Sequence, residues 1–113
     1  IKMANKNSKI TFDIELDENN VPENMKWNSS DNGEGGPCEA SLISIWDSKA
    51  KNTLKIDLWT KEMKVDDMNM LFHQTILTMS DTYGRATGNE KLANQMKEFA
   101  RYFGEESGIV NKE

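Results

Sequence analysis

Residues 53–79 read TLKIDLWTKEMKVDDMNMLFHQTILTM, and within this stretch the spacing of the apolar residues changes. In the first part Leu54, Ile56 and Leu58 alternate with polar residues, which is the pattern of a β-strand with one buried face. From Val65 onward, apolar residues recur at every third or fourth position, as on one face of an α-helix. The stretch therefore predicts the point at which a sheet gives way to a helical region.

The segments before this stretch extend the sheet. Residues 9–17 alternate apolar and polar side chains over their whole length and predict a half-buried strand. Residues 21–27 predict a weaker edge strand or an irregular stretch, because Pro22 cannot donate a hydrogen bond to a neighbouring strand. Residues 28–37 contain three Gly and one Pro and no apolar side chain, so they predict a mobile loop. Residues 39–46 are apolar on both faces, which indicates a strand inside the sheet.

The segments at 39–46 and 53–59 form a predicted hairpin whose register the sequence leaves open. A five-residue loop places Leu42 and Trp46 on the same face as the aliphatic residues of the second strand. A four-residue loop leaves these two on the opposite face, together with Trp59. Because a shift by one residue turns every side chain of a strand to the other face, the loop length decides which residues are exposed.

Two helices are expected in the last half of the chain. The first is predicted to have Asp66 as its N-cap and to end at Gly84, since glycine readily adopts the left-handed conformation of a helix end. The second is predicted to follow a capping box headed by Thr87 and to close near Gly104 or Gly108.

Strands followed by helices predict the α+β fold class. We expect an antiparallel sheet of three to four strands with two C-terminal helices packed on one face. Residues 9–108 are expected to form this single α+β domain. Residues 1–8 are expected to be a disordered N-terminal segment and residues 109–113 a C-terminal tail.

The composition excludes several classes of partner. The net charge is −5, and the basic residues are interleaved with acidic ones, so neither nucleic acid nor an anionic membrane surface is expected as a partner. Cys38 is the single cysteine, which excludes an intramolecular disulfide and fits a reducing compartment. No stretch approaches the ~20 apolar residues of a membrane span, and the first residues lack a signal-peptide core. We therefore expect a cytoplasmic protein without direct membrane insertion.

No constellation of residues indicates catalysis. His73 is the only histidine and falls at the margin of the predicted apolar stripe, where a structural hydrogen bond is the ordinary role. One histidine and one cysteine, Cys38, cannot assemble a usual zinc site. The glycines at 33–36 are not followed by the Lys-Ser/Thr pair of a phosphate-binding loop. We expect no enzyme activity, no catalytic residue, no metal and no cofactor.

Leu42, Trp46 and Trp59 are the candidate binding residues. With the four-residue loop they form an aromatic patch on the sheet face away from the helices. Such patches are typical of protein interfaces. The alternative is that loops or the segment around Trp27 cover the patch.

Several short runs carry a resemblance to a known family. These runs are IDLWTKEM (56–63), VDDM (65–68), FHQT (72–75), DT (81–82) and RAT (85–87), with VP (21–22) and WD (46–47) upstream. In them the chain resembles the gliding motility-associated protein GldC family, over about residues 8–106. The resemblance implies a small cytoplasmic accessory protein of bacterial surface gliding that works alongside membrane-associated gliding components. It implies no catalytic residue and no cofactor.

Three functions are compatible with these patterns. The first is an accessory protein of bacterial gliding motility that binds one or more protein partners of the gliding machinery and catalyses no reaction. The second is a self-associating structural protein whose sheet face forms a homodimer. The third is a small-molecule-binding protein with a pocket near His73.

Overall fold

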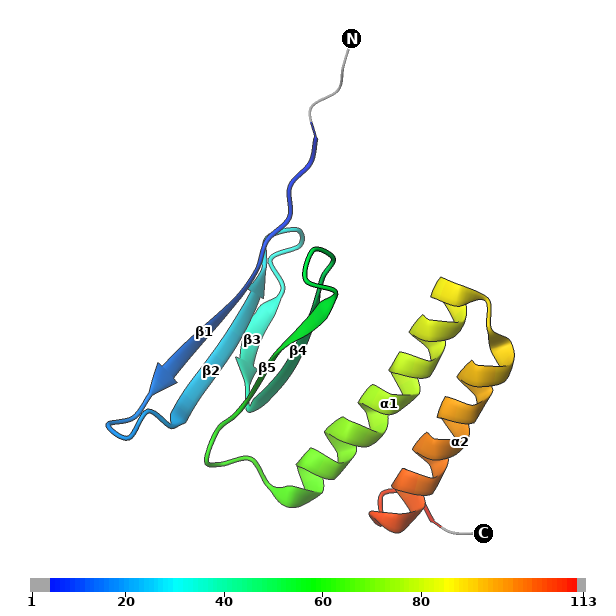
Figure 1. The fold of residues 1–113 in the computed structure, drawn as a ribbon. Helices are drawn as coiled ribbons and strands as arrows, with labels where there is room; N and C mark the ends of the chain where they lie inside the picture. Colours follow the sequence, from blue (N-terminus) through cyan, green and yellow to red (C-terminus); the bar gives the residue numbers. More distant parts are fainter. Residues whose placement is uncertain (1–4, 112–113) are drawn as a thin grey trace. The chain divides into compact units, whose positions relative to one another are not determined.

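Strands precede helices along the chain, in the order that the spacing of the apolar residues predicts. The computed structural model describes residues 5–111. It confirms the α+β fold class. The elements, labelled in Figure 1, are β1 (Ile10–Leu16), β2 (Pro22–Ser29), β3 (Gly35–Cys38), β4 (Ala40–Asp47), β5 (Asn52–Trp59), α1 (Val65–Thr87) and α2 (Glu90–Glu106).

The contacts within the chain divide it into two compact units, one up to Met63 and one from Lys64. The first unit holds the strands and the second holds the helices, and each is described by itself below. The packing of the helices on one face of the sheet stays a prediction, as does the single domain at 9–108.

The predicted terminal segments at 1–8 and 109–113 have outer ends, residues 1–4 and 112–113, that lie outside the described residues. In the C-terminal segment, the amides of the two residues at 109–110 each donate to the carbonyl oxygen of Gly104 at 2.9 Å. This part of the tail therefore turns back onto the last turn of α2.

The strands β1, β2 and β3 form a three-stranded antiparallel sheet in that order. Phe12 pairs with Trp27 and Ile14 pairs with Met25, so the apolar residues of β1 share a face with those of β2. Met25 is the best-covered of these side chains, at 4% exposed. The segment that the sequence predicts as a weak or irregular strand is thus a full strand of this sheet.

The loop predicted at 28–37 is shorter in the structure. Strand β3 occupies its second half and pairs with β2, where Gly36 lies opposite Trp27. A Cβ atom on Gly35 would collide with the carbonyl oxygen of Trp27 and with Asn28. Gly35 thus permits close strand pairing, and the loop prediction was wrong for this half of the segment.

The strands β4 and β5 form a separate two-stranded antiparallel sheet. Asp47 pairs with Asn52, so four residues connect the strands. The Asp47 carboxylate accepts hydrogen bonds from the amides of Lys49 (3.0 Å) and Ala50 (3.2 Å), and Lys51 adopts a left-handed φ of 54°. Of the two registers that the sequence leaves open, the structure has the one with the four-residue loop.

Helix α1 differs from its predicted bounds at both ends. Its N-cap is Lys64, and Asp66 lies inside the first turn instead of capping it. Gly84 lies within the helix, and the C-cap is Gly88, with a φ of 74° and an amide that donates to the Gly84 carbonyl. The predictions of Asp66 as N-cap and of Gly84 as the helix end were therefore wrong, although a glycine in the left-handed conformation does end the helix.

Helix α2 begins after Asn89, not after the predicted cap Thr87. The Asn89 side chain accepts a hydrogen bond from the Leu92 amide at 3.1 Å. Thr87 belongs to α1, where its hydroxyl donates to the Tyr83 carbonyl (2.8 Å) and accepts from the Asn89 amide (3.1 Å). The helix ends shortly before Gly108, which has a φ of 82°.

The two helices pack along a seam of small residues. Ser80 and Ala100 are fully buried, and Ala93 is 3% exposed. A Cβ atom on Gly84 would lie 3.2 Å from the Cβ of Ala93, so the glycine permits the close approach of the helices.

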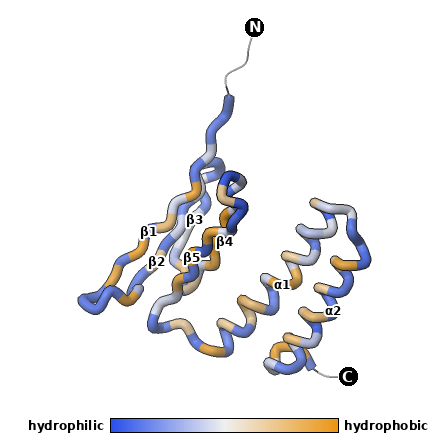
Figure 2. The backbone as a smooth tube through the Cα atoms, in the orientation of Figure 1, coloured by the Kyte–Doolittle hydropathy of each residue, from blue (hydrophilic) through white to orange (hydrophobic). Residues whose placement is uncertain are grey.

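Larger apolar side chains flank this seam and stay partly exposed. The rings of Phe72 and Phe103 stack with their centroids 6.5 Å apart. Met79, Leu92 and Phe99 are 41–53% exposed and line a shallow groove of about 430 Å³ between the helices. Figure 2 shows the corresponding hydrophobic segments recurring along both helices.

Candidate functional site

The three predicted binding residues lie on one face of the β4–β5 sheet. Trp46 pairs with Thr53, and Ala40 pairs with Trp59, and residues that pair share a face. Trp46 is 60% exposed and Trp59 is 54% exposed, while Leu42 is half-buried. We call this surface the tryptophan face; its residues are Ala40, Leu42, Ser44, Trp46, Thr53, Lys55, Asp57 and Trp59.

A polar centre divides the tryptophan face into two apolar ends. The Lys55 ammonium lies 3.0 Å from the Asp57 carboxylate and donates to the Ser44 hydroxyl, also at 3.0 Å. Trp46 lies at the turn end of the hairpin and Trp59 at the other end. At the rise of a β-strand, the two indoles are roughly 20 Å apart along the sheet. The structure thus brings the predicted residues to one face but not into one contiguous cluster.

The opposite face of the same hairpin is aliphatic. Ile45, Leu54 and Ile56 on this face are 46–50% exposed. Apart from Asp47 at the turn, the face carries no charged side chain. We call it the aliphatic face; its residues are Ser41, Ile43, Ile45, Leu54, Ile56 and Leu58.

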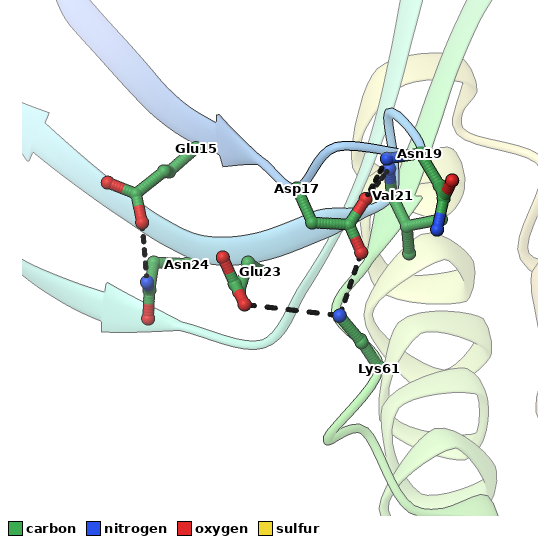
Figure 3. Close-up of polar contacts among 7 residues, drawn as sticks. All are labelled: Glu15, Asp17, Asn19, Val21, Glu23, Asn24 and Lys61. Carbon is green, nitrogen blue, oxygen red and sulfur yellow. Dashed lines mark hydrogen bonds and ion pairs between the residues drawn. The ribbon is translucent and has the colours of Figure 1, made fainter.

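A cluster of charged side chains joins the β1–β2 turn to the segment after β5. Figure 3 shows Lys61 between the carboxylates of Asp17 and Glu23, at 2.7 Å and 3.9 Å. The Asp17 carboxylate also accepts hydrogen bonds from the amides of Asn19 (2.8 Å) and Val21 (3.0 Å). The sequence marks the turn, since Asp and Asn favour turns, but it gives no sign that Lys61 belongs to the same cluster.

These contacts shift the titration of both partners. The hydrogen bond from Lys61, with those from the Val21 and Asn19 amides, lowers the pKa of Asp17 from 3.8 to about 2. The same hydrogen bond to Asp17, together with the attraction between the two charges, raises the pKa of Lys61. A lysine held by carboxylates stays protonated and is no general base, so the cluster is a structural link between two segments.

His73 is fixed within the helical unit. Its Nδ1–H donates to the Ala100 carbonyl oxygen at 3.0 Å. A Cβ atom on Gly104 would lie 2.7 Å from the His73 Cε1 atom, so the helix backbone is close against the ring. This arrangement is the structural hydrogen bond that the sequence suggests, and it leaves the ring little room for a substrate.

Two surface hollows lie on the unit of strands. One of about 530 Å³ runs over β1 and β2, and one of about 400 Å³ lies beside Cys38 and Thr60. Thr60 is 3% exposed, and its hydroxyl has no hydrogen-bond partner among the described residues. Neither hollow is lined by His73. Within residues 5–111, no group of three or more His, Cys, Asp or Glu residues is placed to hold a metal ion.

The family model described as gliding motility-associated protein GldC-like matches residues 22–109, which is most of the chain. The chain belongs to this family. The resemblance carried by the runs between positions 21 and 87 is thereby confirmed. A comparison with curated proteins and one with solved structures found no match.

The range matched by the GldC-like family runs from β2 through α2. It includes all three predicted binding residues, and it excludes β1 and Asp17. Membership makes this chain a gliding motility-associated protein. Within the part of the chain that the structure describes, no helix has the length and hydrophobicity to cross a bilayer.

Proposed function

We propose that this GldC-like protein is a cytoplasmic accessory protein of bacterial gliding motility that binds a protein partner of the gliding machinery and catalyses no reaction. The proposed contact surface is the tryptophan face, with Leu42, Trp46 and Trp59 as contacts. The observation that carries the proposal is the exposure of large apolar side chains on both faces of one hairpin.

A single layer of helices cannot cover both the aliphatic face and the tryptophan face of the β4–β5 hairpin. The unit of strands leaves Ile45 and Leu54 exposed on the aliphatic face and both tryptophans exposed on the tryptophan face. One layer of helices covers one face of a sheet at most. If α1 and α2 cover one face, as the sequence predicts, the other face still exposes apolar area to water. Exposed patches of this kind mark interaction sites on soluble proteins.

The chemistry of the faces indicates which one serves a partner. The aliphatic face has the composition of a protein core, with branched side chains and no charge outside the turn. The tryptophan face combines indoles with the Lys55–Asp57 ion pair. Tryptophan supplies a large apolar area together with a polar N–H, and it is enriched in protein interfaces. The tryptophan face therefore fits a transient protein–protein interface, and the aliphatic face fits permanent packing in a core.

Complementation of a gliding-deficient deletion strain tests the proposal. The double variant Trp46→Ala/Trp59→Ala removes both exposed indoles and should abolish or strongly reduce gliding. Because both side chains are more than half exposed, the free energy of unfolding should change by about 0.5 kcal/mol per substitution, or roughly 1 kcal/mol for the pair. Cell spreading, the protein level in the cells and circular dichroism are measured together.

The matched control is Tyr102→Ala, which removes an aromatic side chain of α2 that is 58% exposed. It should leave gliding intact. Full gliding by the double tryptophan variant at normal protein level would overturn the choice of site. Equal loss of gliding in the control would show that the effect is not specific to this face.

The small-molecule alternative has weaker support. His73 already donates a hydrogen bond to α2, and Gly104 lies against its ring. The two hollows on the unit of strands are not lined by His73, so neither is the predicted pocket. Self-association through the sheet face, the remaining alternative, draws on the same exposed apolar side chains.

A further inference from the structure

The outer edge of β5 presents backbone groups that could pair with another strand. Among the described residues, the sheet of β5 contains only β4 beside it. The Thr60 amide donates to the Glu39 carbonyl oxygen at 2.8 Å, in the same register as the β4–β5 pairs. Along an antiparallel strand, successive residues direct their backbone N–H and C=O groups alternately toward the paired strand and away from it. Because Thr60 bonds to the β4 side, Ile56, four residues earlier, also directs its amide and carbonyl toward β4. The residues that direct theirs outward are Thr53, Lys55, Asp57 and Trp59.

This edge lacks the usual protection of edge strands. Proteins protect such edges with bulges, prolines and isolated charges. The β4–β5 pairing shows no register shift and β5 contains no proline, whereas the pairing of β1 shifts between Glu15 and Leu16. A β1 strand paired with its own copy about its central residue, Asp13, would also place two carboxylates side by side. Self-pairing is therefore opposed at β1 and not at β5.

We propose that two copies of this chain pair through β5, in antiparallel order, with Ile56 on the two-fold axis. The result is a four-stranded sheet in the order β4–β5–β5–β4. In this register Lys55 lies opposite Asp57 of the partner subunit, and Asp57 lies opposite Lys55 of the partner subunit. Leu54 lies opposite Leu58 of the partner subunit, and Ile56 opposite Ile56 of the partner subunit.

Complementarity of charge and of apolar surface selects this register. Each cross-strand pair joins a cation to an anion or an aliphatic side chain to another, and both kinds of pair stabilise sheets. A register centred on Lys55 or on Asp57 would place like charges opposite each other. A single Lys on an edge strand normally opposes pairing, but Asp57 supplies the opposite charge two residues away on the same face. The strand is thus complementary to a second copy of itself.

The dimer would also join the two separated ends of the tryptophan face. Trp46 pairs with Thr53, which in the proposed register lies opposite Trp59 of the partner subunit. The indoles of the two subunits then share one row of the sheet, roughly 10 Å apart, which is two strand spacings. Each such row holds one tryptophan from each copy, so a surface that is split in one chain is completed by the second.

The dimer and the partner-binding face can be tested apart. Pairing uses the edge of β5 and leaves both faces of the hairpin free, so the dimer does not depend on the proposed function. Only the use of the joined tryptophan rows by a partner rests on that function. Solution measurements on the purified chain test the dimer, whereas gliding tests the face.

Sedimentation of the purified full chain, over roughly three decades of concentration, provides the first test. The wild type should show a monomer–dimer equilibrium. Lys55→Asp and Asp57→Lys each place like charges opposite each other twice, and each should weaken dimerisation about ten-fold or more. The double variant Lys55→Asp/Asp57→Lys restores opposite charges and should dimerise like the wild type. A mixture of the two single variants should form a mixed dimer, because every facing pair is then of opposite sign.

A cysteine cross-link tests the register itself. In a Cys38→Ser background, Ile56→Cys places two thiols across the two-fold axis in a non-hydrogen-bonded pair, where the Cα atoms are about 4.5 Å apart and within disulfide range. Leu54→Cys, on the same face, places its thiols too far apart to bridge. Mild oxidation should cross-link the first variant and not the second. A strictly monomeric wild type, or equal cross-linking of both variants, would overturn the proposal.

Discussion

At the residue scale, Asp17 shows how one side chain links segments that are distant in the sequence. Its carboxylate accepts hydrogen bonds from two backbone amides of its own turn and forms an ion pair with Lys61, which follows β5. The turn could be predicted from the sequence, because Asp and Asn side chains hydrogen-bond to nearby amides. The partner could not, since the two residues follow strands of different sheets and only the tertiary arrangement brings position 61 beside position 17.

We predict that Asp17→Asn lowers the free energy of unfolding near neutral pH and that this loss shrinks in acid. The pKa of Asp17 in the folded protein, about 2, lies below the ordinary value of 3.8. The carboxylate therefore stabilises the folded state above a pH of about 4, and this stabilisation is lost as the pH falls through about 2. Urea denaturation of both proteins at a series of pH values measures the difference.

Glu18→Gln is the control, since it removes a neighbouring carboxylate of the same turn. It should not reproduce the pH dependence of Asp17→Asn. A stability difference between wild type and Asp17→Asn that stays constant from neutral pH down to about 2 would contradict the assigned ion pair.

At the scale of elements, glycine has three different roles in this chain. Gly88 ends α1 in a left-handed conformation, as the sequence rules for helix ends require, although they favour Gly84 equally well. Gly84 and Gly104 permit close contact between the helices, and Gly35 permits close strand pairing. Local sequence shows that a glycine is present, but only the packing around it shows which role it has.

We predict that Gly104→Ala destabilises the helical unit by up to about 2 kcal/mol. Alanine favours a helix over glycine by about 1 kcal/mol, but overpacking costs roughly 1–3 kcal/mol. The new Cβ would lie 2.7 Å from the His73 Cε1 atom and 2.9 Å from the Val110 Cγ2 atom. Thermal and urea unfolding, followed by the helical circular dichroism signal, measure the change.

Gly36→Ala serves as the control, because a Cβ atom there meets nothing within 4 Å. Its effect on the free energy of unfolding should be smaller. A Gly104→Ala variant more stable than the wild type would contradict the close approach of the α2 backbone to the His73 ring.

At the scale of the whole molecule, the described surface exposes many large apolar side chains to water. The sheet of β4 and β5 exposes one aliphatic face and one tryptophan face, and the helical pair exposes its own apolar groove. Burying such area is the main driving force of association between proteins. The second copy proposed at the β5 edge and the partner proposed at the tryptophan face are two ways in which this chain uses its surface.

We predict that the melting temperature of the full chain rises with protein concentration. A dimer stabilises the folded state by mass action, so the shift follows the strength of pairing. The shift should be absent or reduced in Lys55→Asp and present in Lys55→Asp/Asp57→Lys. Differential scanning fluorimetry at several concentrations measures it. A melting temperature independent of concentration in the wild type would argue against a dimer of any geometry.

The sequence by itself determined the class of the fold and the family. Apolar residues recur at every second position in the strands and at every third or fourth position in the helices, and this spacing can be read locally. The runs between positions 21 and 87 carry the family resemblance. The same reasoning proposed the tryptophans as candidate contacts, because contiguous apolar patches mark interaction sites, and this choice stays a prediction. It failed at residues 35–37, which belong to strand β3, at both caps of α1 and at the N-cap of α2.

Only the tertiary structure decided the register of the hairpin, and with it the content of both faces. Loop length changes by one residue at little local cost, yet it turns every side chain of a strand over. The structure has the four-residue loop, so Trp46 and Trp59 share a face and Lys55 and Asp57 lie between them. It also joined Asp17 to Lys61 and His73 to Ala100. Contacts of this kind connect residues far apart in the chain, and no local pattern encodes such pairs.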